Sequence, residues 1–283
     1  MRRRRPEEPA EQAFEGTVRQ AALRVGSTIT SYDGETATLD GRLSGTVALA
    51  DLRAACELEP RGQWLRVVQG ALHGLSQSAQ VELDLRDVDA VRPLLRSRVY
   101  AEGALLADDV ATQHLAEGLV EVLVAEVDGA VRSLPTTVVD GWGVSRGELF
   151  VQGRQQVLAA GLLTRRELDL EGVVLTALES SAPFAATHVH WLPSYVDVPA
   201  AGALVALPTR HLVLVAPMVG RTQTIDAAQA LLVNADRLWR DGPGELSPDL
   251  WWWKPPELVL LPGDPTSLRP PIEFLQVLDG LPG

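Results

Sequence analysis

Along this chain, stretches that alternate apolar and polar residues are followed by stretches with apolar residues at helical spacing, and this order recurs. It occurs near residues 28–58, again at 119–160 and again at 203–239. Short turns such as Asp33-Gly34 join the strands, and such turns make paired strands antiparallel. We therefore expect an α+β fold of antiparallel β-hairpins with packed helices, repeated as hairpin–helix units, rather than a doubly wound parallel sheet.

Residues 119–161 form the clearest of these units. Leu119–Val127 is predicted as a strand, Asp128-Gly129 as a two-residue turn and 130–139 as the returning strand. A helix over Arg146–Ala160 follows, and Gly161 ends it. The other predicted elements are helices at 7–25, 49–58, 62–75 and 225–239, a hairpin at 28–39, and strands at 168–178, 203–207, 211–216, 250–253 and 257–261.

The pattern of hydrophobic and polar residues differs between the two halves of the chain, and the change falls between about Gly103 and Gln113. A chain of this length has room for two domains of ordinary size. We expect an N-terminal α+β subdomain over residues 1–107 and a second α+β domain over 108–283. The tail of the second domain, from Pro262 onward, is rich in proline and is expected to be only weakly structured.

The charge of the chain limits its partners. The formal net charge is −12, and an acidic protein repels the phosphates of nucleic acids. No apolar run approaches the length that spans a bilayer, and the basic segment Arg2–Arg5 is followed by Glu7 and Glu8 instead of an apolar export segment. Cys56 is the only cysteine, which excludes an internal disulfide. We expect a cytoplasmic protein that binds neither nucleic acid nor membrane.

Ser145 supports two interpretations. Gly143–Gly147 matches the G-x-S-x-G pattern, in which the serine of a hydrolase lies on a tight strand-to-helix turn. Ser145 and Glu148 also have the spacing of a helix capping box. The downstream pairs in the order that a hydrolase requires are Asp197 with His211 and Asp169 with His188. Because a hairpin, and not a helical crossover, precedes the serine, the cap is favoured.

His188 and His190 are the candidates for a metal site. On a strand, residues two apart share a face, so both rings could reach one ion. His211, Asp197 and Asp169 are conceivable further ligands, but no second spaced motif supplies one. The sequence also lacks a phosphate-binding P-loop, a dinucleotide fingerprint and a zinc-protease helix. We expect no metal and no cofactor.

The run Trp251-Trp252-Trp253 is the least ordinary part of the composition. On a strand the outer two tryptophans share one face, so the middle one lies on the other. Either the C-terminal tail covers the outward face, for instance through Phe274 and Leu275, or the tryptophans anchor a protein interface. Trp239 would extend the same interface. Arg210, in a turn between two apolar strands, is a candidate for pairing with a carboxylate or phosphate of a ligand or partner.

Four short motifs in the second half resemble motifs of one bacterial family. They are Leu119–Val127, Gly143–Leu149, Ala206–His211 and Leu246–Leu250. In this order they resemble the first strand, the helix start, the step between two strands and the segment before the last strands of the YtpQ-type family, whose function is unknown. Thr209 and His211 depart from the family pattern. The resemblance covers roughly residues 90–262 and implies a fold but no reaction.

The expected function follows from the charge, the tryptophans and the resemblance. We expect a non-enzymatic, cytoplasmic accessory protein of a bacterial multi-protein system that acts as an adaptor, a chaperone or an immunity-type inhibitor. Its partner is expected to be another protein, of basic character, or a second copy of the chain. The alternatives are a serine hydrolase that uses Ser145 and a metal site at His188 and His190.

Overall fold

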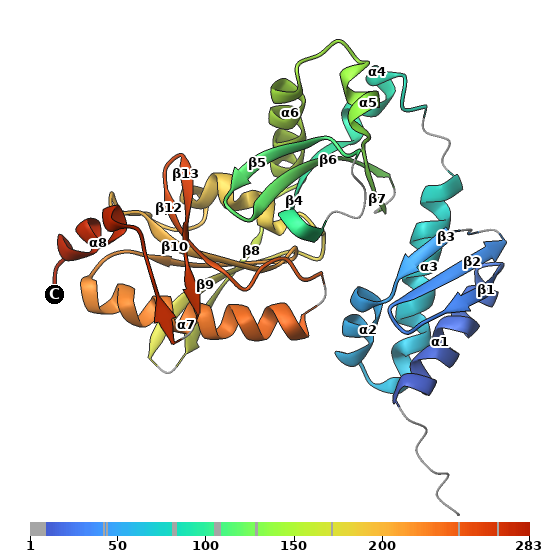
Figure 1. Ribbon diagram of the computed structural model, residues 1–283, viewed down its shortest axis with the longest axis horizontal. Coiled ribbons are helices and arrows are strands. Elements are labelled where there is room, and N and C mark those ends of the chain that lie inside the picture. Colours follow the sequence, from blue (N-terminus) through green and yellow to red (C-terminus); the bar gives the residue numbers. More distant parts are fainter. Residues whose placement is uncertain are drawn as a thin grey trace, which may run out of the picture. The chain divides into compact units, whose positions relative to one another are not determined.

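The chain forms two compact units, Met1–Glu82 with Val127–Ala130 and Leu83–Glu126 with Val131–Gly283. Both units combine helices with antiparallel strands, which confirms the predicted α+β class (Figure 1). The computed structural model describes residues 10–41, 43, 45–80, 84–104, 109–127, 130–170, 172–242, 244–264 and 266–283.

The division between the units lies earlier in the chain than the expected boundary near residue 107. Strand β4 (Leu95–Ala101) pairs along its whole length with β6 (Leu119–Val127), so β4 and the part of β6 up to Glu126 belong to the second unit. The parts of the prediction that lie outside the described residues are the boundary itself at 105–108, the Arg2–Arg5 segment and the turn at Asp128-Gly129.

The first unit packs three helices against a small antiparallel sheet. Its elements are α1 (Ala10–Arg24), β1 (Ser27–Tyr32), β2 (Thr36–Gly41), β3 (Gly45–Ala48), α2 (Ala50–Glu57), η1 (Arg61–Gln63) and α3 (Trp64–Gln80), with the strands in the order β1-β2-β3. The ring of Phe14 meets the ring of Trp64 edge to face, and Cys56 is fully buried beside them in the same core. The cysteine is therefore a packing residue.

The second unit begins with a four-stranded sheet. β6 lies between β4 and β5, and it also pairs with β7. The remaining elements of this part are α4 (Val88–Val91), η2 (Arg92–Leu94), η3 (Glu102–Ala104), β5 (Thr112–Ala116), β7 (Ala130–Ser133), α5 (Thr136–Asp140) and α6 (Arg146–Ala159). Helix α6 lies directly on β4, because a Cβ atom at Gly153 would come within 2.9 Å of the backbone of Arg96.

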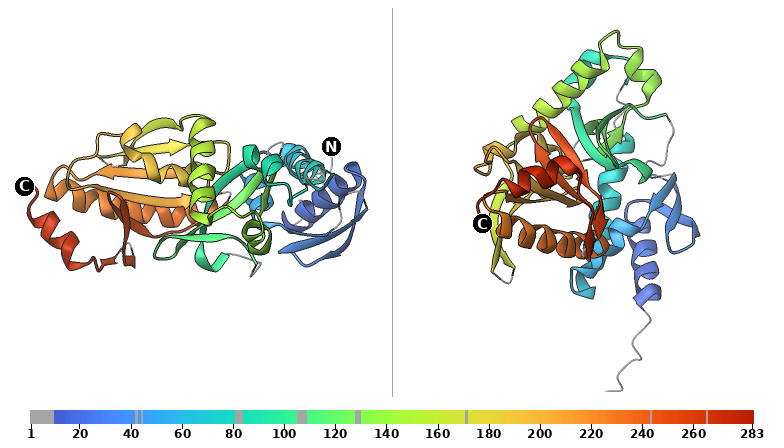
Figure 2. Two further views of the ribbon diagram at one scale, coloured as in Figure 1. Left: turned by 90° about the horizontal axis from the view of Figure 1, so that it is seen from above. Right: turned by 60° about the vertical axis from the view of Figure 1, so that its left-hand side comes forward.

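A six-stranded antiparallel sheet forms the larger part of the second unit, with strand order β13-β12-β10-β11-β9-β8. Its strands are β8 (Thr164–Leu170), β9 (Val173–Glu179), β10 (Ala203–Thr209), β11 (Leu212–Pro217), β12 (Leu250–Lys254) and β13 (Glu257–Leu261). α7 (Arg221–Asp241) and α8 (Ile272–Asp279) cover one face, and the 3-10 helix η4 (Ala185–Ser194) packs on the other (Figure 1, Figure 2). Both faces of the central strands are buried as a result.

Three predicted elements differ from the observed ones. The strand expected at 130–139 ends at Ser133, because Pro135 precedes a helix, α5. The strand expected at 168–178 is instead two strands, β8 and β9, with Gly172 at a φ of 91° between them. The C-terminal tail, expected to be weakly structured, forms the hairpin β14 (Gly263–Asp264)–β15 (Ser267–Leu268) and helix α8.

Candidate functional site

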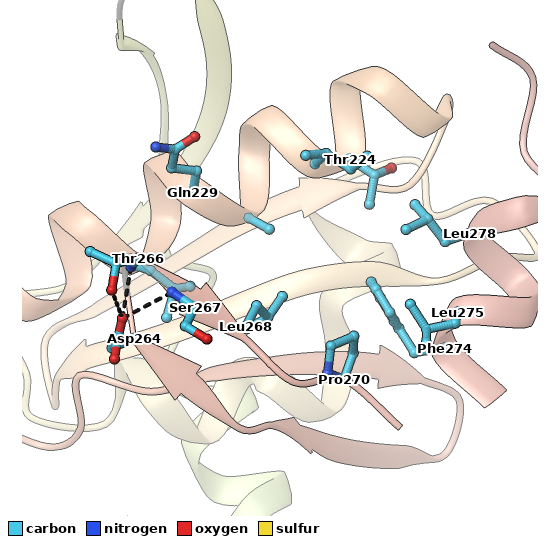
Figure 3. Close-up of a pocket in the computed structure, with 13 residues that line it drawn as sticks. Thr224, Gln229, Asp264, Thr266, Ser267, Leu268, Pro270, Phe274, Leu275 and Leu278 are labelled. Atoms are coloured by element: carbon cyan, nitrogen blue, oxygen red, sulfur yellow. Dashed lines mark hydrogen bonds between the residues drawn. The ribbon is translucent and has the colours of Figure 1, made fainter. Parts of the chain in front are cut away.

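A pocket of about 400 Å³ lies between α7 and the C-terminal segment 264–278, and we call it the α7 pocket (Figure 3). Helix α7 contributes Thr224, Ile225, Ala228, Gln229 and Leu232. The hairpin β14–β15 and helix α8 contribute the opposite wall, with Asp264, Thr266, Ser267, Leu268, Pro270, Phe274, Leu275 and Leu278. The pocket therefore exists only because the proline-rich tail folds back toward α7.

Helical periodicity decides which residues of α7 close the pocket and which stand at its rim. Thr224, Ala228 and Leu232 are four residues apart, so they share one face of the helix, and all three are buried. Ile225 and Gln229 each follow one of these residues by one position, which turns them to the exposed side of the helix. The closed side of the pocket is thus largely apolar, and a large exposed apolar side chain, Ile225, stands at its opening.

The Asp264 carboxylate holds the hairpin of the opposite wall together. Its Oδ1 accepts hydrogen bonds from the N–H of Thr266 at 2.7 Å, from the Thr266 hydroxyl at 2.6 Å and from the N–H of Ser267 at 3.0 Å (Figure 3). The bond from the Thr266 side chain, followed by those from the backbone, lowers the pKa of Asp264. The carboxylate is therefore ionised at neutral pH and stabilises the turn.

One part of the pocket wall is aromatic. Phe274 of α8 is buried, and its ring meets the ring of Trp252 edge to face. The indole N–H of Trp252 donates to the carbonyl oxygen of Ala201 at 2.8 Å, which fixes the ring from its other end. Leu275, the neighbour of Phe274, is 42% exposed and lines the pocket. The wall is therefore rigid inside and apolar at its edge.

The chemistry of the α7 pocket is that of a binding site for an apolar group. Among the described residues that line it, Asp264 alone carries an ionisable side chain. Elsewhere, the described residues contain no group of three or more His, Cys, Asp or Glu side chains that could hold a metal ion. Buried apolar walls with a few fixed polar groups are typical of pockets that bind by burial of apolar surface.

The tryptophans expected at a protein interface lie in the core. Trp251, Trp252 and Trp253 are 0%, 2% and 6% exposed. Trp251 and Trp253 share one face of the sheet and pack with η4, while Trp252 packs with α7 and α8 on the other face. The interface hypothesis for these three residues is corrected because both faces of β12 are covered within the chain. Trp239 is half-buried on α7.

Ser145 is the N-cap of α6. Its backbone is extended, with φ −64° and ψ 138°, and its Oγ accepts a hydrogen bond from the N–H of Glu148 at 3.3 Å. Arg146, the next residue, pairs with Asp140 at 2.6 Å. Within the described part of the chain, no histidine hydrogen-bonds to the Ser145 hydroxyl. This geometry agrees with the role of Ser145 as a helix cap.

The two histidines do not share a face as residues of a strand would. Both lie in the 3-10 helix η4, next to a break in helical geometry at Trp191. Nδ1 of His188 lies 2.6 Å from the hydroxyl of Tyr195, whereas Nε2 of His190 lies 3.1 Å from a carboxylate oxygen of Glu121. The ring nitrogens of His188 and His190 contact different partners, so the two imidazoles do not face one common metal-binding position.

Glu121 organises a buried polar cluster that sequence reasoning missed. It is 0% exposed and accepts hydrogen bonds from the Arg154 guanidinium, from the Ser97 hydroxyl at 2.8 Å and from His190. Burial by itself raises the pKa of Glu121, but the bonds from His190 and Arg154 outweigh it, so the pKa is lowered. A single carboxylate in the apolar run Leu119–Ala125 was the available sequence signal, since a buried charge requires a partner.

Arg210 lies in the turn between β10 and β11 and is half-buried. Its N–H donates to the carbonyl oxygen of Gly244 at 2.8 Å, and its own carbonyl oxygen accepts the N–H of Ala185. A Cβ atom at Gly244 would come within 2.8 Å of Arg210 Cγ, so the glycine makes room for the side chain. The residue thus connects three segments of the unit, and its role toward a ligand or partner stays a prediction.

Comparison with family models, with curated proteins and with solved structures finds no match to this chain. The resemblance to the YtpQ-type family therefore stays a prediction. Among the described residues, no helix is long and apolar enough to cross a lipid bilayer.

Proposed function

We propose that this chain is a non-enzymatic binding protein that takes up an apolar side chain of a partner protein in the α7 pocket. The observation that carries this proposal is the combination of a pocket of about 400 Å³ with two exposed apolar residues at its opening. These are Ile225, which is 49% exposed, and Leu275, which is 42% exposed. Apolar residues grouped around a cavity are characteristic of sites that bind other proteins.

The energetics favour an apolar occupant. Transfer of one leucine- or phenylalanine-sized side chain from water into such a pocket contributes about 1.5–3 kcal/mol. The buried side of the pocket, formed by residues such as Ala228 and Leu232, offers apolar contacts. A charged occupant would lose its hydration without a countercharge on that side.

The only ionisable side chain among the described lining residues supports binding over catalysis. General acid–base catalysis uses a group whose pKa lies near the working pH. Asp264 has a lowered pKa, and its carboxylate is engaged by Thr266 and Ser267. In this proposal the chain acts as an accessory protein in the cytoplasm, which its net charge of −12 and its single cysteine support.

Variants at the rim test the proposal. Ile225→Glu and Leu275→Glu place a charge at the opening of the pocket, and Val233→Glu is the matched control. Val233 is also 49% exposed on α7 but does not line the α7 pocket. Co-purification from the native host, quantified by mass spectrometry, should recover a partner with the wild type and with Val233→Glu, and lose it with both rim variants. Equal recovery with all four proteins would contradict the proposal.

A further inference from the structure

The first unit contains a groove with a charge opposite to that of the whole chain. The groove measures about 550 Å³ and lies between the end of α1 and one face of α3, two helices that pack side by side (Figure 1). Arg24 of α1 and Arg66 of α3 line it, together with Gln69, Gly70 and His73. No aspartate or glutamate occurs among its described lining residues, although the chain carries a net charge of −12.

The two arginines leave donors available in the groove. Arg66 is exposed, and its guanidinium has no hydrogen bond, ion pair or ring contact with any described residue. Arg24 Nη1 donates to Gln69 Oε1 at 3.2 Å. A guanidinium has five N–H donors, so this bond orients Arg24 while other donors can still reach a ligand. Arginine in this state binds carboxylates or phosphates in a two-point fork.

The lining residues of α3 follow the helix for two turns. Arg66, Gly70 and His73 are four and then three residues apart, which places them on one face. The distance along the helix from Arg66 to His73 is about 10 Å, at 1.5 Å a residue. A ligand that follows this face is therefore longer than one phosphate.

Gly70, an exposed glycine of α3, leaves space at the lined face of the groove. Glycine inside a helix is destabilising relative to alanine, so it usually has a packing reason. At Gly70, however, a Cβ atom would meet nothing within 4 Å, and the same holds at Gly62, which also lines the groove. Close packing within the chain does not require either glycine. Both keep the floor of the groove free of side chains.

We propose that this groove binds an acidic peptide segment of another protein, whose carboxylates pair with Arg24 and Arg66. Charge complementarity selects an anionic occupant, and the length of the lined face selects a segment of peptide over a single anion. Partly buried Leu65 adds an apolar contact at the same face. The groove is lined by residues of the first unit, whereas the α7 pocket is lined by residues of the second unit.

The test uses the full chain and a fluorescently labelled octaglutamate peptide in a fluorescence anisotropy titration at low ionic strength. We expect saturable binding that becomes about fivefold or more weaker in Arg66→Ala and that weakens with added salt. Arg86→Ala is the control for charge, because Arg86 is an exposed arginine of the other unit. Equal weakening in both variants would overturn the site.

A second pair of variants separates the groove from general electrostatic attraction. Gly70→Leu fills the groove, whereas Gly16→Leu places the same side chain at an exposed glycine of α1 with equally open surroundings. We expect Gly70→Leu to abolish peptide binding and Gly16→Leu to leave it unchanged, and identical effects would overturn the proposal.

A competition experiment with inorganic pyrophosphate distinguishes the peptide from a phosphate ligand. Displacement of the peptide by an equal or lower concentration of pyrophosphate would assign the groove to phosphate instead.

Discussion

The rings of Trp252 and Phe274 meet edge to face, with 5.5 Å between their centroids and 78° between their planes. Edge-to-face pairs stabilise a contact beyond the apolar area that they bury. This one joins the middle tryptophan of β12 to a helix that begins after two prolines. Together with α7 it covers Trp252, and it holds α8 in the wall of the α7 pocket that faces α7.

Truncation of Phe274 should therefore destabilise the second unit. For Phe274→Ala we expect the free energy of unfolding to fall by about 3–5 kcal/mol, because a buried ring and its contact with Trp252 are lost. Urea titration followed by tryptophan fluorescence measures this change. Ile272→Ala, at a residue of the same helix that is 71% exposed, should change stability by no more than about 0.5 kcal/mol. Equal losses in the two variants would show that α8 does not pack on the sheet.

Removal of Arg154 should leave the buried carboxylate of Glu121 with too few partners. We expect Arg154→Ala to cost about 3–5 kcal/mol of stability in thermal or urea unfolding. The control is Arg146→Ala, which removes the ion pair with Asp140. Because the Asp140 side chain is 51% exposed, this variant should lower the free energy of unfolding by no more than about 1 kcal/mol. A small effect at Arg154 would mean that water reaches Glu121.

Stability should depend on pH through His188. Burial lowers the pKa of His188 from 6.5 to about 4, so between these values the unfolded chain binds a proton that the folded chain does not. The free energy of unfolding therefore falls as the pH drops from 6.5 to 4, by at most about 1.4 kcal/mol per unit from this group. His188→Gln should reduce that fall, measured by urea unfolding at several pH values. His114→Gln, at an exposed histidine, should behave as the wild type.

The capping role of Ser145 has a measurable cost. Ser145→Ala removes the acceptor for the N–H of Glu148 and should lower stability by about 1 kcal/mol. Ser194→Ala, at an exposed serine of η4, should stay within about 0.5 kcal/mol of the wild type. Covalent labelling of Ser145 by a fluorophosphonate probe would contradict the structural role and favour the hydrolase hypothesis.

Local patterns predicted most of the elements. The turn at Asp33-Gly34 and the cap at Ser145 were identified because turn chemistry and capping depend on residues a few positions apart. The same local view failed in the C-terminal tail. There the many prolines favour an irregular segment, although Phe274 and Leu278 have helical spacing. Helix α8 is stabilised by packing against a sheet that is distant in sequence.

The candidate sites were harder to predict because they join distant segments. Glu121, Arg154 and His190 come from a strand, a helix and a 3-10 helix, and no spacing along the chain connects them. On a strand His188 and His190 would share one face, whereas in the structure both lie in the 3-10 helix η4, next to a break in helical geometry at Trp191. The α7 pocket likewise required Ile225 and Leu275, which are fifty positions apart, to meet across a cavity.

By itself, the sequence determined that Trp251 and Trp253 lie on one face of a strand and Trp252 on the other, because alternation is a property of the extended backbone. It also determined the α+β class, since the hairpin turns are local. Only the tertiary structure decided that both faces of β12 are covered, by η4 on one side and by α7 and α8 on the other. Burial is set by which distant segments pack together, and that choice depends on the free energy of the whole fold.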